Sequence, residues 1–143
     1  MTEVRETGLR AGDALHAVVE FGEAQGVIAK ARDFTAAFLQ EAAADSGPYT
    51  ARDIDAARLV VSELVTNVVK YAPGPCRLEL SLYAGTLEIS VLDTRPVTPV
   101  ARPRDPDRLG QHGMEIVLAL CDGVETEAVA PYGKRVRARL PLG

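Results

Sequence analysis

The spacing of hydrophobic residues changes early in the chain, and this change limits the folds that the chain can adopt. From Leu15 to Phe21 apolar and polar side chains alternate, which is the pattern of a half-buried strand. After Gly22 the apolar residues recur every three or four positions instead, which indicates an amphipathic helix over about residues 24–44. The chain therefore begins its folded part with a strand followed by a helix.

A second helix and a hairpin follow. Thr50 and Asp53 have the spacing of a capping box and predict a helix start, and the Pro73-Gly74-Pro75 sequence ends that helix near residue 72. Two alternating runs, 77–83 and 86–93, are separated by Ala84-Gly85 and predict two strands joined by a tight turn.

The last third of the chain begins with a segment rich in proline and arginine. Residues 94–109 contain four of the nine prolines and four arginines, and they predict a long loop. A short apolar helix is expected over 113–120, and a closing hairpin over 124–129 and 135–140. The order of these elements favours a two-layer α/β sandwich with a mixed, mostly antiparallel sheet and helices on one face.

Length and composition are those of one domain. The chain has 143 residues, 47% of them hydrophobic; residues 1–12 are polar and predict a flexible tail, with the domain over 13–143. A net charge of −4 argues against direct nucleic-acid binding. The sequence has no apolar run of bilayer length and only two cysteines, which are too few for a disulfide framework, so we expect a cytoplasmic protein that does not enter a membrane.

The second predicted helix has one polar face that can carry chemistry. On a helical wheel Glu63, Asn67 and Lys70 lie opposite the apolar stripe, and Glu63 and Asn67 are four residues apart. A carboxylate and an amide can therefore point together at a ligand. A solvated polar face is the alternative interpretation, and spacing alone does not decide between the two.

Two further segments have features of a ligand site. Asp93 ends a predicted strand, where its carboxylate can meet a ligand or form an Asx-turn. Gly110 and Gly113 precede the last predicted helix, whose free N–H groups and positive dipole end attract phosphate. Ordinary loop closure also accounts for two such glycines.

In their order and separations these segments resemble the GHKL ATPases, in particular the branch of anti-sigma-factor serine kinases and related small ATP-binding proteins. Residues 62–72, SELVTNVVKYA, resemble the N-box of that family. Residues 91–96 with Pro99 resemble the first glycine-box segment, 109–117 the second glycine box, and 133–141 the terminal strand. The resemblance implies the Bergerat ATP-binding fold over about residues 24–141.

The resemblance also implies roles for individual residues. Glu63 would orient or deprotonate the attacking hydroxyl group, Asn67 would bind Mg²⁺, and Asp93 would accept a hydrogen bond from the adenine amino group. His112 can neutralise phosphate only when protonated, and its ordinary pKa of about 6.5 leaves it mostly neutral at pH 7. Arg135 stands where the family often has a small hydroxyl residue near the adenine. The full implied nucleotide-binding set is Asn67, Lys70, Asp93, Gly110, His112, Gly113 and Met114.

The implied function is that of an ATP-binding regulator. We expect an anti-sigma factor with serine/threonine kinase activity that uses ATP and Mg²⁺ to phosphorylate an anti-sigma-factor antagonist, with a sigma factor as a further partner and a homodimer as one option for its assembly. The alternative is a non-catalytic protein in which nucleotide sets the conformation of the loop that a sigma factor or another regulator recognises.

Overall fold

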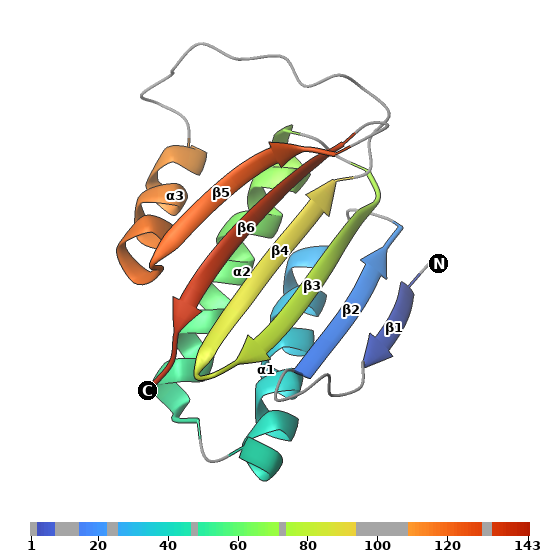
Figure 1. Cartoon of the computed structure of the whole chain (residues 1–143). Helices are drawn as coiled ribbons and strands as arrows, with labels where there is room; N and C mark the ends of the chain where they lie inside the picture. Colours follow the sequence, from blue (N-terminus) through green and yellow to red (C-terminus); the bar gives the residue numbers. More distant parts are fainter. Residues whose placement is uncertain are drawn as a thin grey trace.

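The computed structural model describes residues 3–7, 15–22, 26–46, 49–71, 74–93, 109–129 and 133–143, with side chains omitted at 3–7, 44–46, 71 and 109–113. These residues form three helices and a six-stranded sheet (Figure 1). The helices are α1 (Val27–Ser46), α2 (Ala51–Tyr71) and α3 (Leu109–Leu120). The strands are β1 (Glu3–Thr7), β2 (Leu15–Phe21), β3 (Cys76–Tyr83), β4 (Thr86–Asp93), β5 (Gly123–Ala128) and β6 (Lys134–Pro141).

The sheet has the order β1-β2-β3-β4-β6-β5, and each of these neighbouring pairs is antiparallel. The three helices lie on one of its faces (Figure 1). The predicted two-layer α/β sandwich with helices on one face is therefore confirmed, but the described sheet is antiparallel throughout and not mixed as we expected. None of the described helices combines the length and the apolar character needed to cross a bilayer.

The core lies between the sheet and the helices. The strand register aligns Ala17, Leu80, Ile89 and Ala138 in one row across four strands, and all four are buried. The apolar stripe of α2 is buried as well, including Val61, Leu64, Val65 and Val68. Alternate strand residues and one stripe of each helix thus form a single aliphatic core.

The other face of the sheet carries pairs of opposite charge. Arg77 donates a hydrogen bond to Glu20 on the neighbouring strand, and Arg139 Nη1 lies 2.6 Å from Glu125 Oε1. Such partly exposed pairs contribute little stability individually. They keep this face polar, so the sheet has only one face suited to packing against helices.

The hairpin between β3 and β4 turns at the predicted residues. Ala84 has a φ of 51° and Gly85 a φ of 78°, which is the pair of positive angles that a type I′ turn requires. Glycine tolerates this conformation, whereas alanine is strained there because of its Cβ. The turn brings the two long strands into register over all eight residues of each.

Two further expectations need correction. Residues 3–7, which we expected in a flexible tail, form β1 and pair with β2; the charged sequence EVRET has little alternation to reveal an edge strand. The last helix begins at Leu109 and not at residue 113, because Gly110 and Gly113, in its first two turns, have low helix propensity and mask its start. The loop predicted over 94–109 lies outside the described residues up to position 108.

Candidate functional site

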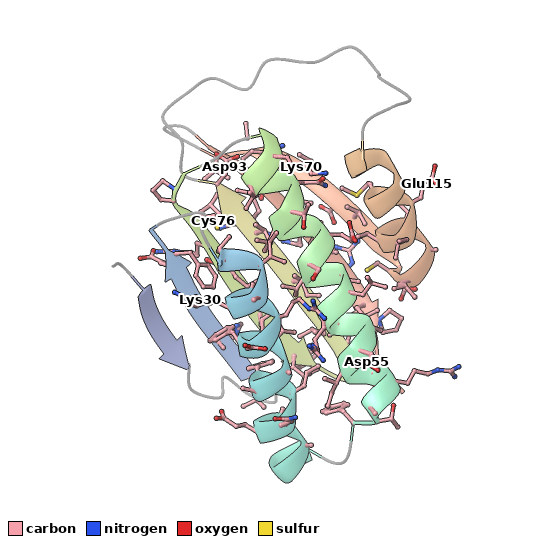
Figure 2. All side chains as sticks on the ribbon, turned by 180° about the vertical axis from the view of Figure 1, so that it is seen from behind. Lys30, Asp55, Lys70, Cys76, Asp93 and Glu115 are labelled. Atoms are coloured by element: carbon pink, nitrogen blue, oxygen red, sulfur yellow. The ribbon has the colours of Figure 1, made fainter. Side chains whose placement is uncertain are left out.

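Three segments with predicted site residues, α2, β4 and α3, reach the same end of the domain as the start of β6. The helix α2 and the strand β4 both end there, and α3 and β6 both begin there (Figure 1). In the view from the helix side, Lys70 near the end of α2 and Asp93 at the end of β4 lie at this end, whereas Asp55 lies at the opposite end of α2 (Figure 2). The antiparallel pairing of β4 with β6 fixes this arrangement, because it places Asp93 beside the first residue of β6.

The α2 residues lie at the border between core and solvent. Glu63 and Asn67 are half-buried, and Lys70 is exposed. Their neighbours Leu64, Val65 and Val68 are packed in the core, which fixes the rotation of the helix about its axis. The helix thus keeps the carboxylate of Glu63 and the amide of Asn67 on a face that a ligand can reach.

Asp93 is one of the few polar residues buried among the described side chains, with 5% of its surface exposed. It shares a strand face with Ile89 and Val91, so it belongs to the helix-facing side of the sheet. Its direct neighbour on β3 is Cys76. The pKa of the Cys76 thiol is raised to about 11, first by burial and then by the negative charge of Asp93. A carboxylate held this way at the edge of the core can accept hydrogen bonds from a ligand but cannot donate them.

The position of Arg135 differs from the expectation. The register pairs Asp93 with Lys134 and pairs Leu92 with Arg135. Arg135 therefore lies on the opposite face of the sheet, where its guanidinium group is 3.9 Å from Glu79 and 3.8 Å from Glu127. It does not stand beside Asp93 in the sheet. The residue that stands there is Lys134.

The glycine segment lies in the first two turns of α3. Gly110, His112 and Gly113 all belong to this helix, and their side-chain environment lies outside the described part of the structure. The first four N–H groups of a helix have no partner within it and can bind an anion. In α3 these are the backbone N–H groups of 109–112, so Gly110 is among them, whereas Gly113, which we expected to precede the helix, is its fifth residue. Met114 is half-buried and packs against the core.

The described side chains suit a magnesium ion that binds together with the phosphates of a nucleotide. Among them no group of three or more histidine, cysteine, aspartate or glutamate residues could hold a metal by itself. Mg²⁺ is commonly bound by one or two protein oxygens together with phosphates and water. The half-buried Asn67 offers one neutral oxygen of this kind, with the Glu63 carboxylate one helical turn away.

Lys134 and Cys76 were not identified from the sequence as neighbours of the site. Both lie directly across from Asp93 in the sheet. The alternation of side chains along β6 decides which of the two adjacent cations, Lys134 or Arg135, faces the helices. Without the register of the β4–β6 pair, however, that choice is not fixed by the sequence alone.

Comparison with known proteins agrees with the geometry. Residues 22–140 match the family model of the histidine kinase-like ATPase domain. A search of curated protein sequences finds no significant match. The matched range includes α1, α2, α3 and all strands that contribute to the end of the domain described above. The chain therefore belongs to the histidine kinase-like ATPase domain family.

Proposed function

We propose that this protein binds Mg-ATP at the end of the domain where α2, β4, α3 and β6 meet, and that it is an anti-sigma factor with serine/threonine kinase activity. Its protein substrate is an anti-sigma-factor antagonist, and its place of action is the cytoplasm. Membership of the histidine kinase-like ATPase family supports ATP binding. The kinase activity and the partners are the proposed steps beyond that assignment.

The observation that carries the proposal is the convergence of segments distant in sequence. Lys70 and Asp93 are 23 positions apart in the sequence, yet both lie at this end of the domain (Figure 2), and Asn67 precedes Lys70 by three residues on α2. The glycine-containing first turn of α3 begins there too. A Mg-nucleotide needs three kinds of group: a carboxylate that accepts a hydrogen bond from adenine, an amide oxygen that binds the metal, and free backbone N–H groups that bind phosphate.

The chain's own residues divide the work in this proposal. Asp93 accepts a hydrogen bond from the adenine amino group, and Asn67 supplies an oxygen to Mg²⁺, which neutralises phosphate charge. Glu63 orients the attacking serine hydroxyl and accepts its proton. Phosphoryl transfer depends mostly on positioning and charge neutralisation, so no covalent protein intermediate is required.

Two variants of α2 test the kinase proposal. Glu63→Ala should keep Mg-ATP affinity near the wild-type value and abolish phosphate transfer, because a base acts mainly in the transition state. Asn67→Ala should weaken Mg-ATP binding as well, because it removes a metal ligand from the ground state. Asp55→Ala is the matched control: this residue lies at the far end of the same helix, with its side chain 75% exposed (Figure 2).

The measurements are calorimetric titration with Mg-ATP and transfer of labelled phosphate to an antagonist protein encoded near this gene. Wild type and Asp55→Ala should bind nucleotide and phosphorylate the antagonist alike. Absence of nucleotide binding at millimolar concentration would refute the site. Nucleotide binding without any phosphoprotein, together with equal partner binding by wild type and Glu63→Ala, would refute the kinase and favour the non-catalytic, nucleotide-gated regulator.

A further inference from the structure

Asp93 and Lys134 form a directly opposed pair in the sheet. They are register partners at the end of the β4–β6 ladder. Directly opposed residues of an antiparallel pair point to the same face, with Cβ atoms roughly 4.5–5.5 Å apart. Asp93 faces the helices and is buried, so Lys134 projects from the same face, and it is half-buried. The candidate adenine site therefore has an anionic side chain, Asp93, beside a cationic one, Lys134.

We propose that Lys134 is a specificity-determining residue that donates a hydrogen bond from Nζ to the N1 atom of adenine. This atom is next to the 6-amino group, which donates a hydrogen bond to Asp93. This inference rests on the proposed function, since it concerns the same nucleotide site. It adds a protein contact to a second atom of the base.

The hydrogen-bonding capacities of the two side chains match one edge of adenine. Lysine can only donate, and an ionised carboxylate can only accept. Adenine carries a donor, the 6-amino group, directly beside an acceptor, N1. Guanine carries the reverse at these two positions, an acceptor at O6 and a donor at N1. The Asp93–Lys134 pair is thus complementary to adenine and opposed to guanine placed in the same orientation.

The neighbouring Arg135 supplies a matched control. It is also a cation on β6, but it lies on the opposite face and is engaged by Glu79 and Glu127. Replacing Arg135 removes the same net charge one position away from Lys134. General electrostatic attraction for a nucleotide would be weakened by both replacements, whereas a contact to N1 would be lost only with Lys134.

The experiment compares ADP with 1-deaza-ADP, in which a C–H group replaces N1, by calorimetric titration in the presence of Mg²⁺. Wild type should bind ADP about 10- to 100-fold more tightly than 1-deaza-ADP, the effect of one hydrogen bond from a charged donor. Lys134→Met keeps most of the aliphatic side chain and should bind both ligands equally. Arg135→Met should retain the wild-type preference.

The outcomes separate this inference from the function on which it rests. If wild type binds neither ligand, the proposed nucleotide site is wrong, and the inference is wrong with it. If wild type binds ADP but Lys134→Met keeps the full preference over 1-deaza-ADP, only the inference is overturned. Equal affinity of the wild type for both ligands would overturn it too, and that measurement does not depend on the stability of any variant.

Discussion

Replacing Asp53 with alanine should loosen the start of α2. The Asp53 side chain accepts two hydrogen bonds, from the backbone N–H of Thr50 at 3.0 Å and from that of Gly143 at 3.1 Å. The first is half of a capping box, whose other half is the bond from Asp53 N–H to the Thr50 hydroxyl oxygen at 3.1 Å. The second attaches the chain after β6 to the helix that carries Glu63 and Asn67.

The expected loss follows from these contacts. A surface hydrogen bond contributes about 0.5–1 kcal/mol net, and a carboxylate in the first turn of a helix adds about 0.3–1 kcal/mol. Asp53→Ala should therefore lower the free energy of unfolding by about 1–2 kcal/mol, measured by urea denaturation at pH 7. Asp55→Ala is the control, because its carboxylate is highly exposed and lies 3.9 Å from Arg58; it should cost less than about 0.5 kcal/mol.

The effect of Asp53 should also depend on pH. Its pKa is lowered from 3.8, first by the hydrogen bond from Gly143 N–H and then by that from Thr50 N–H. A lowered pKa in the folded state means that the stabilisation is fully present above the unfolded-state pKa and disappears as pH falls through the folded-state value. The difference between wild type and Asp53→Ala should thus be constant from pH 7 to pH 5 and shrink in stronger acid. Equal stability of the two proteins at pH 7 would refute this account of the helix start.

Two further predictions concern the hairpin and the buried thiol. Ala84→Asn should raise the free energy of unfolding by about 0.5–1 kcal/mol, because asparagine tolerates the positive φ of 51° better than alanine; a loss of stability in urea denaturation would contradict the type I′ assignment. In a Cys121→Ser background, Cys76 should resist Ellman's reagent at pH 8 in the folded protein and react after unfolding, since it is buried and its pKa is raised to about 11. Rapid reaction of the folded protein would show that the thiol is accessible.

Much of the fold could be predicted because its elements have strong local signals. The helix α2 begins within the Thr50–Asp53 capping box and ends before the Pro73-Gly74-Pro75 sequence, so both of its limits are encoded locally. The hairpin likewise turns at Ala84-Gly85 as predicted. The strand β1 was missed because an edge strand of charged residues gains its structure from pairing with β2, which no local pattern reports.

The candidate site was predictable to the extent that its residues lie on helices. The helical period alone puts Glu63 and Asn67 on one face away from the apolar stripe, and the structure places them at the border of the core. The β6 side of the site was not predictable in the same way. A shift of one residue in register exchanges Lys134 and Arg135 between the two faces, and register is a property of the β4–β6 pair rather than of either strand. The roles of these residues in nucleotide binding stay predictions.

The place of β6 within the sheet has a consequence for how the protein is made. This strand is inserted between β4 and β5, although it follows both in the chain. During translation β4 must wait for more than 40 further residues, the interval from Asp93 to Lys134, before its second edge is covered. At about 5–20 residues per second, that edge is open for roughly 2–8 seconds on the ribosome. The edge of β4 that β6 later covers is thus a surface that chaperones could recognise in the nascent chain. A nucleotide that contacts both Asp93 and Lys134 could stabilise the domain only after β6 has emerged.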